Sequence, residues 1–361
     1  MITNIQETLT EMALIYQWSD NTYEQYKLII EKWANFNQMT FQELIMEAET
    51  DETKIHKTSK RTIKKRLIQY HVYLQQKNKK PNTIKSYISK IKKVYKYCDI
   101  EVPELPPIRN NIKETYEDIP TKDEIKKALL HSSIKIRALV TFIASSGLRR
   151  SDVAALKVGD FFKATTEYHD AHNVIEMIQQ LEKRDTIIPE WHITSVKTGV
   201  QHITFSSHES TIYILQMLKE KILDNEILLT DSLFGIRKET ITKHFQLIND
   251  RMGFGWKETR RKFHPHSMRK YFSTSLTNND VDYLTTEFLV GHTLSSVDQS
   301  YYFANPRKLK NKYLRVMEHL TFTLDVSYID VTSREKRELQ ELRAYRRESE
   351  ERMKKLEEMV Y

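Results

Sequence analysis

The chain has 361 residues, 39% of them hydrophobic and 29% charged, with a formal net charge of +8. This length suits two domains that each bury a core, and no apolar run approaches the roughly 20 residues of a membrane span. The single cysteine, Cys98, excludes an internal disulfide and a cysteine-based metal cluster, and the first residues lack the pattern of a signal peptide. We therefore expect a cytoplasmic protein with no membrane partner.

The positive charge is concentrated in one stretch near the N-terminus. Between Thr53 and Cys98 there are 15 lysines and arginines and no aspartate or glutamate, and several tyrosines stand among them. Such side chains neutralise phosphates one by one, so the stretch favours a nucleic-acid partner over an ordinary solvated helix face. The candidate DNA-binding residues are Lys57, Lys60, Arg61, Lys64, Lys65, Lys85, Lys90 and Lys93.

The same region has the apolar spacing of helices. Intervals of four and three residues separate Ile84, Ile88, Ile91 and Tyr95. Pro81 precedes them as a helix start signal. From about residue 102 four prolines follow without clean periodicity, which indicates an extended linker. We therefore expect a helical DNA-binding domain over residues 1–112, including the linker, and a second domain over residues 113–325.

The second domain begins with helices. Thr121 followed by Glu124 predicts a capped helix start. The stretch 136–161 predicts two helices separated by Gly147, the second with Ser151 as its N-cap. Further along, residues 192–205 hold two β-rich runs around a Thr-Gly pair, which predicts a hairpin with Lys197 beside its turn.

Another helix start lies in HPHSMRKYFSTSL, residues 264–276. Pro265 suits the first helical turn. His266 and Arg269 are three residues apart and therefore share one face of the helix. The opposite, apolar face is predicted to carry Met268, Tyr271 and Phe272. This separation into a polar and an apolar face makes His266 and Arg269 candidates for a site.

The end of the chain, residues 326–361, is a charged stretch with strong helix propensity. Arg346 and Ser349 interrupt its 3-4 apolar spacing, which leaves open a coiled coil or a single helix that docks on a neighbouring subunit. The predicted fold class is mainly α with a small β-hairpin (α+β), in two domains that enclose a DNA duplex like a clamp.

One set of residues in the second domain has an obvious joint use: Arg149, Lys197, His266, Arg269, His292 and Tyr301. Cleaving a phosphodiester without a metal requires cations for the non-bridging oxygens, a nucleophile, and a proton donor for the leaving oxygen. Arginine forks match phosphate geometry, a tyrosine can attack phosphorus, and lysine and histidine can move protons. We therefore expect phosphoryl transfer with no cofactor and no metal.

These segments, in this order, resemble the tyrosine recombinase (phage-type integrase) family. SGLRRSDVAAL is similar to the family's arginine segment, HSMR to its His-x-Leu-Arg segment, and LVGH to its Leu-Leu-Gly-His segment. The family nucleophile usually lies nine residues after the last histidine, which points to Tyr301. The lysine-rich front domain resembles the family's core-binding domain, so the resemblance spans roughly residues 15 to 305.

The resemblance implies a role for each residue. Arg149 and Arg269 would clamp the scissile phosphate, with Asp152 supporting Arg149 and His292 adding a hydrogen bond. Lys197 would be the general acid toward the leaving 5′-oxygen.

His266 would accept the proton of Tyr301. Two alternatives stay open: Lys183, upstream of the hairpin, competes with Lys197, and Tyr302 competes with Tyr301. The stretch 161–189 is longer than the family pattern, and contact with DNA or a neighbouring subunit is its expected role.

The implied function is site-specific DNA recombination through a covalent 3′-phosphotyrosine, by a homotetramer on two copies of a double-stranded DNA site. The resemblance covers both an integrase of a mobile element and an Xer-like recombinase. It places the protein at the nucleoid and leaves open an accessory DNA-bending protein. A type IB topoisomerase and a catalytically silent DNA-binding protein on the same fold remain as alternatives.

Overall fold

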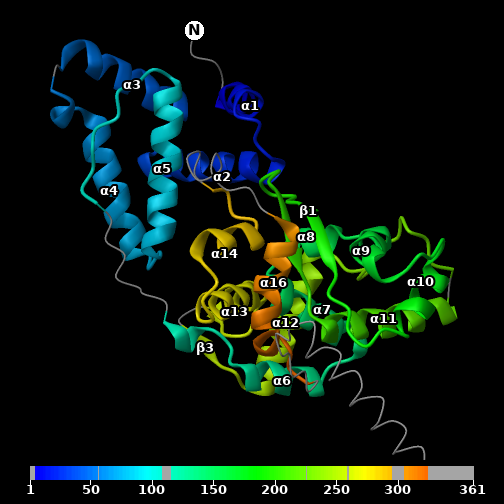
Figure 1. Ribbon diagram of the computed structural model, residues 1–361. Helices are drawn as coiled ribbons and strands as arrows, with labels where there is room; N and C mark the ends of the chain where they lie inside the picture. Colours follow the sequence, from blue (N-terminus) through cyan, green and yellow to red (C-terminus); the bar gives the residue numbers. More distant parts are fainter. Residues whose placement is uncertain are drawn as a thin grey trace, which may run out of the picture. The chain divides into compact units, whose positions relative to one another are not determined.

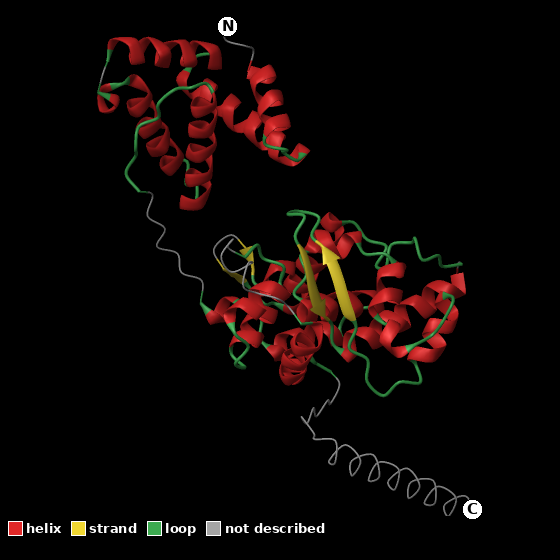
Figure 2. Ribbon diagram, turned by 45° about the horizontal axis from the view of Figure 1, so that its top comes forward, coloured by secondary structure: helices red, strands yellow, loops and turns green. Residues whose placement is uncertain are grey.

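The computed structural model describes residues 5–55, 57–107, 115–224, 226–257, 260–294 and 305–323. The chain divides into two compact units, unit 1 (residues 1–113) and unit 2 (residues 114–361). Both are built mainly from α-helices (Figure 1), and unit 2 also holds two antiparallel hairpins, whose strands are yellow in Figure 2. The predicted fold class, mainly α with a small β-hairpin in two domains, is therefore confirmed, while the enclosure of a DNA duplex stays a prediction. Within the described ranges, the helices lack the combined length and apolarity of a membrane span.

Unit 1 is a bundle of helices around an aromatic core. Its helices are α1 (Ile5–Ile15), α2 (Asp20–Asn37), α3 (Phe41–Lys54), α4 (Thr62–Gln76) and α5 (Pro81–Tyr97), with a 3-10 turn at Thr58–Lys60. Trp33 and Tyr95 are buried at its centre, and the indole Nε1 donates a hydrogen bond of 3.2 Å to the tyrosine hydroxyl. The four apolar residues predicted to line α5 are all buried, which confirms this helix and its start at Pro81.

Unit 2 is organised around one buried helix, α7. The helices before the larger hairpin are α6 (Lys122–Leu130), α7 (Ile134–Ser146), α8 (Arg150–Ala155), α9 (Val158–Ala164) and α10 (Val174–Leu181). Those after it are α11 (His208–Asp224), α12 (Lys238–Met252), α13 (Pro265–Thr277), α14 (Tyr283–Leu289) and α16 (Pro306–Val316). Short 3-10 turns lie at Tyr116–Asp118, Thr166–Tyr168 and Met317–Leu320. Because α7 packs against both α11 and α13, the residues that follow its C-terminus start deep inside the unit.

Two predicted helix starts are confirmed in unit 2. Thr121 caps α6, since its Oγ1 accepts from the amide of Glu124 at 3.2 Å and its own amide donates to the Glu124 carboxylate at 2.8 Å. Pro265 occupies the first turn of α13, and Met268 and Phe272 on its apolar face are fully buried. Both starts are set by residues next to each other in the sequence, which is why the sequence predicts them.

The predicted hairpin consists of β1 (Glu190–Thr194) and β2 (Gln201–Phe205), paired antiparallel with Thr194 opposite Gln201. Gly199 takes a left-handed φ of 69° in the connection, and Lys197 lies in the turn, as predicted. A second hairpin, β3 (Trp256–Lys257) with β4 (Arg260–Arg261), was not predicted. Two residues per strand are too few for an alternating pattern to show in the sequence.

The stretch 161–189 is part of the folded core. It contains the end of α9, a 3-10 turn and α10, and it buries Phe161, Met177 and Leu181 in the hydrophobic cluster of unit 2. Lys310 of α16 forms an ion pair with Glu167 in this stretch. The added length therefore supports α16 as well as the region around β1.

One predicted helix cap is wrong. Helix α8 begins at Arg150 with Arg149 as its N-cap, whereas the sequence suggested Ser151. The Arg149 carbonyl accepts from the amide of Asp152 at 2.9 Å, while the Ser151 hydroxyl donates to the Asp152 carboxylate at 3.3 Å. Because Arg149 is extended (φ −70°, ψ 145°) and makes no side-chain cap, its guanidinium remains available for contacts elsewhere.

A substitution at Gly147 tests how tightly the α7–α8 junction is built. Gly147 has φ +66°, and a Cβ there would lie 2.8 Å from Cε1 of the buried Phe272. Gly147→Ala is expected to lower the free energy of unfolding by about 1–2 kcal/mol for the left-handed backbone and by about 1–3 kcal/mol more for overpacking. Chemical denaturation of the full chain measures this loss.

The matched control is Gly253→Ala. Gly253 ends α12 with nearly the same φ, +68°, but a Cβ there would meet nothing within 4 Å. It should therefore cost only the backbone part, about 1–2 kcal/mol. Equal losses for the two variants would contradict the close packing of Phe272 on Gly147.

Candidate active site

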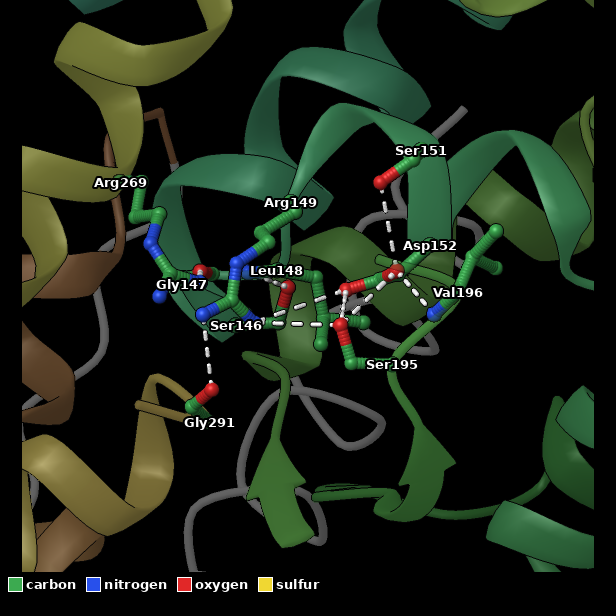
Figure 3. A network of polar contacts seen from close by, with 10 residues as sticks. All are labelled: Ser146, Gly147, Leu148, Arg149, Ser151, Asp152, Ser195, Val196, Arg269 and Gly291. Atoms are coloured by element: carbon green, nitrogen blue, oxygen red, sulfur yellow. Dashed lines mark hydrogen bonds and ion pairs between the residues drawn. The ribbon is translucent and has the colours of Figure 1, made fainter. Parts of the chain in front are cut away.

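Arg149 lies at the centre of a polar network in unit 2 (Figure 3). Its Nη2 donates to the carbonyl of Gly291 at 2.8 Å, and its Nη1 donates to the hydroxyl of Ser195 at 3.3 Å. These partners come from the end of α14 and from the end of β1, so the guanidinium joins two distant parts of the chain. Its side chain is only 19% exposed, which limits its access to one open side.

Asp152 anchors this network through its carboxylate group. Its carboxylate is buried and accepts from the Val196 amide at 2.9 Å and from the Ser195 hydroxyl at 3.3 Å. The Arg149 Nη1 lies 3.9 Å from the same carboxylate. Asp152 therefore holds the hairpin turn and Arg149 in one arrangement, which agrees geometrically with a supporting acid.

Arg269 lies beside Arg149 and is almost completely buried, at 5% exposure. Its Nη1 donates to the Gly147 carbonyl at 2.7 Å, whereas its Nη2 has no hydrogen-bond partner among the described residues. Burial, and then the neighbouring Arg149, lower the pKa of Arg269 to about 10. The sequence thus places a desolvated cation with one open donor next to a second cation.

The lowered pKa of Arg269 has a definite sign for stability. Because the folded pKa is below the usual value of 12.5, the unfolded chain binds this proton more tightly than the folded chain. The contribution therefore opposes folding at neutral pH and diminishes only as the pH rises through about 10 and beyond. Such an arrangement is unfavourable for the empty site and favourable for an anion bound in it.

Both arginines are held by carbonyls at helix ends. Gly147 ends α7 and Gly291 follows α14, each with a left-handed φ, +66° and +67°. The amides of Gly291 and His292 donate back to Phe288 and Glu287 at 2.9 Å, which is the Schellman pattern of a helix C-terminus. Helix C-termini carry partial negative charge, so they are suitable partners for guanidinium groups.

His292 is oriented by Glu287 of the preceding helix, α14. Its Nδ1 lies 2.8 Å from the carboxylate of Glu287, and 45% of its side chain is exposed. A carboxylate accepts hydrogen bonds, so Nδ1 carries a proton and Nε2 is directed away from Glu287. His292 therefore follows directly after Gly291, whose carbonyl accepts from Arg149, and its Nε2 is left for a partner other than Glu287.

Lys197 and His266 are exposed residues. Lys197 lies in the turn that begins after Ser195, the residue that contacts Arg149. His266 lies one helical turn before Arg269 on α13. Lys183 precedes β1, at the end of the hairpin away from this turn, and a strand rises by about 3.3 Å per residue. Lys197 therefore lies at the same end of the hairpin as Ser195, the partner of Arg149, whereas Lys183 precedes the opposite end.

Two predictions lie outside the described residues. Tyr301 and Tyr302 fall in the gap between residues 294 and 305, and the whole predicted C-terminal helix, residues 326–361, follows residue 323. The elements on either side of the tyrosines are anchored in unit 2. Tyr313 of α16 is fully buried and donates its hydroxyl to the Ser145 carbonyl at 2.9 Å, four residues before Arg149.

The DNA-binding candidates of unit 1 divide into two groups. Side chains that are exposed or partly exposed belong to Lys57, Lys60, Lys64, Lys65, Lys85, Lys90 and Lys93. Arg61 is a correction, because it is buried and bound by Glu52 at 2.8 Å and Glu101 at 3.1 Å. Its guanidinium stabilises the end of α3, and a phosphate cannot reach it in this arrangement.

Sequence reasoning missed several residues that build the site. Ser195 and Glu287 orient Arg149 and His292, and the Gly291 carbonyl completes the set. A glycine after an apolar helix is a signal for a left-handed helix end, and it was used for Gly147 but not for Gly291. Ser195 had no such signal, because its role depends on a contact 46 positions away in the sequence.

The fold and site define a two-unit helical protein in which two largely buried arginines, Arg149 and Arg269, lie side by side. A family model described as "Phage integrase family" matches residues 121–308, more than half of the chain, and the chain therefore belongs to the phage integrase family. The family and enzyme class predicted from the sequence, a tyrosine recombinase of the integrase type, are confirmed.

The chain is similar to named recombinases. "Tyrosine recombinase XerA" of Saccharolobus solfataricus is 22% identical, over 68% of this chain and 71% of the relative. "Tyrosine recombinase XerD" of Listeria monocytogenes is 21% identical, over 68% of this chain and 80% of the relative. These matches cover most of each relative.

Solved structures establish the fold. A lambda integrase dimer bound to a COC′ core site has a TM-score of 0.53 at 13% identity, covering 82% of this chain and 94% of that one. The integrase of transposon Tn1549 in complex with transposon right-end DNA has a TM-score of 0.50 at 13% identity, covering 86% and 98%. At this identity the likeness concerns the fold and not the residues of the site.

The hydrogen bonds of the Asp152 carboxylate around Arg149 are tested by Asp152→Asn, which keeps the shape of the side chain and removes its charge. The two arginines would then repel each other without this counterion, so the free energy of unfolding should fall by about 2–4 kcal/mol. Chemical denaturation measures the change. Asp250→Asn is the control, since Asp250 pairs with Arg261 at the surface and its loss should leave the free energy of unfolding nearly unchanged.

Proposed function

We propose that this chain is a site-specific DNA recombinase that cleaves and rejoins strands through a covalent 3′-phosphotyrosine. The observation that carries the proposal is the buried Arg269, whose Nη2 has no partner among the described residues and which lies beside Arg149. Two largely buried cations side by side, one of them with an unpartnered donor, form a site for one compact anion. A phosphodiester in a DNA backbone is an anion of this kind.

The arrangement suits the transition state better than the ground state. Negative charge increases on the non-bridging oxygens as a fifth bond forms at phosphorus, and preorganised cations stabilise that increase. Arg149 and Arg269 are already fixed by carbonyls and need no reorganisation. His292, with Nδ1 tied to Glu287, is oriented to add a hydrogen bond through Nε2.

The reaction follows from the roles that the family resemblance gives to the other residues. The hydroxyl oxygen of Tyr301 attacks phosphorus and loses its proton to His266, while the bond from phosphorus to the 5′-oxygen breaks. Lys197 donates a proton to that oxygen, which leaves a free 5′-hydroxyl. The new phosphotyrosine ester keeps the energy of the broken bond, so another 5′-hydroxyl can reverse the step without an external energy source.

Unit 1 is proposed as the core-binding domain and unit 2 as the catalytic domain. The exposed lysines of α4 and α5 would neutralise phosphates on the DNA, and aromatic contacts hold some of these lysines in place. Lys93 Nζ, for example, lies 3.7 Å from the centre of the Tyr16 ring. A homotetramer on two sites, with the C-terminal stretch contacting a neighbouring subunit, completes the proposal.

The experiment is covalent trapping on DNA that the protein itself selects. Random-sequence duplexes are enriched by rounds of binding to the full chain, and a nick is then placed so that a released fragment makes cleavage irreversible. A DNA adduct that survives denaturation is expected for the wild type and for Tyr302→Phe, and no adduct is expected for Tyr301→Phe. Arg269→Met should also lose the adduct while still binding the duplex.

Each of the other outcomes would support a different nucleophile or a different activity. Loss of the adduct only in Tyr302→Phe would move the nucleophile by one residue. Relaxation of supercoiled plasmids without any selected site would indicate a type IB topoisomerase. Binding of the selected duplexes with no adduct in the wild type would refute the proposal and indicate a catalytically silent DNA-binding protein.

A further inference from the structure

His202 is a buried histidine next to the site that no sequence motif singled out. It lies on β2 opposite Ile193 and is only 4% exposed. Neither ring nitrogen makes a hydrogen bond of normal geometry to a described residue, and the polar interaction left to the ring is a weak one with the backbone of Val200. A buried imidazole that is so weakly satisfied costs free energy, so its presence at this position needs an explanation.

The ring of His202 packs directly on Gly291. A Cβ added to Gly291 would lie 2.6 Å from Nε2 and 2.7 Å from Nδ1 of His202, so the imidazole fills the space that the glycine leaves open. Gly291 is the residue whose carbonyl accepts from Arg149 at 2.8 Å. His202 therefore contacts the residue that binds Arg149, a predicted catalytic arginine.

The same ring also separates two structural elements. Arg149 is held between Ser195, at the end of β1, and Gly291, at the end of α14. His202 lies on β2, which is paired with β1, and contacts the end of α14. His202 therefore lies between the elements that supply the two partners of Arg149.

We propose that His202 is a positioning residue, a spacer between the hairpin and the end of α14 that places the Gly291 carbonyl and the Ser195 hydroxyl where both bind Arg149. The inference rests on the proposed function for the role of Arg149 in phosphate binding. The spacer must be uncharged, because Arg149 and Arg269 lie nearby and a third cation would be repelled. Burial lowers the pKa of His202 to about 4, against the raising effects of the Val200 backbone and Asp152 and with smaller lowering effects from the two arginines, which keeps the ring neutral at physiological pH.

The contact itself is tested by stability, without any assay of activity. Gly291→Ala is measured in the wild-type chain and in a His202→Ala background by thermal unfolding of the full chain. Gly291→Ala should lower the melting temperature more in the wild type, because in the His202→Ala background only the left-handed backbone disfavours alanine. Equal shifts in the two backgrounds would show that His202 does not constrain Gly291 and would overturn the proposal.

The positioning role is tested by the rate of adduct formation on the selected nicked DNA. His202→Ala should slow this rate about tenfold or more at unchanged DNA affinity, because a small displacement of a catalytic group is costly. His202→Met, which is flexible and similar in volume, should restore most of the rate. His169→Ala, at another buried histidine of unit 2 that is bonded to Thr165, is the control and should leave the rate unchanged.

The remaining outcomes are decisive in different ways. A wild-type rate in His202→Ala would overturn the positioning role even if the stability coupling is found. A stable His202→Met variant as slow as His202→Ala would show that the ring nitrogens, and not the spacing, matter. A wild type that binds DNA without forming an adduct would refute the proposed function, while the stability measurement would still decide whether the contact exists.

Discussion

The site depends on two backbone carbonyls, those of Gly147 and Gly291, each of which holds one arginine in place. Both glycines terminate helices in a left-handed conformation and have a ring packed where a Cβ would be, Phe272 in one case and His202 in the other. Neither position therefore accommodates another residue without rearrangement. The helices α7 and α14 deliver these carbonyls, and the packing of α7 against α11 and α13 keeps the first of them fixed.

The adjacent arginines lower the stability of the folded chain and at the same time prepare the site to bind an anion. Two guanidinium groups lie side by side in a largely buried place, with Asp152 and Glu287 as the nearest counter-charges that affect Arg269. The partial negative charges at the C-termini of α7 and α14 reduce the repulsion between the two arginines but do not remove it. A bound anion would add the missing negative charge, so anion binding at this site would stabilise the folded chain.

Local features were predictable from the sequence and long-range contacts were not. The capping pair Thr121 and Glu124, the proline start of α13 and the apolar stripe of α5 each depend on residues within one or two helical turns. Arg61 was assigned to DNA binding because the charges were counted along one stretch of sequence only. Glu52 of α3, outside that stretch, forms an ion pair with it. The contact of His202 with Gly291 joins positions 89 residues apart, and no local pattern records it.

The most direct measurement of the central claim, that Arg149 and Arg269 form a preorganised anion site, needs no knowledge of the DNA sequence. Thermal unfolding of the full chain is followed in sulfate and in chloride at equal ionic strength, for the wild type, Arg269→Met and the surface control Arg261→Met. Sulfate should raise the melting temperature of the wild type and of Arg261→Met more than that of Arg269→Met. The same gain in all three proteins would contradict the claim.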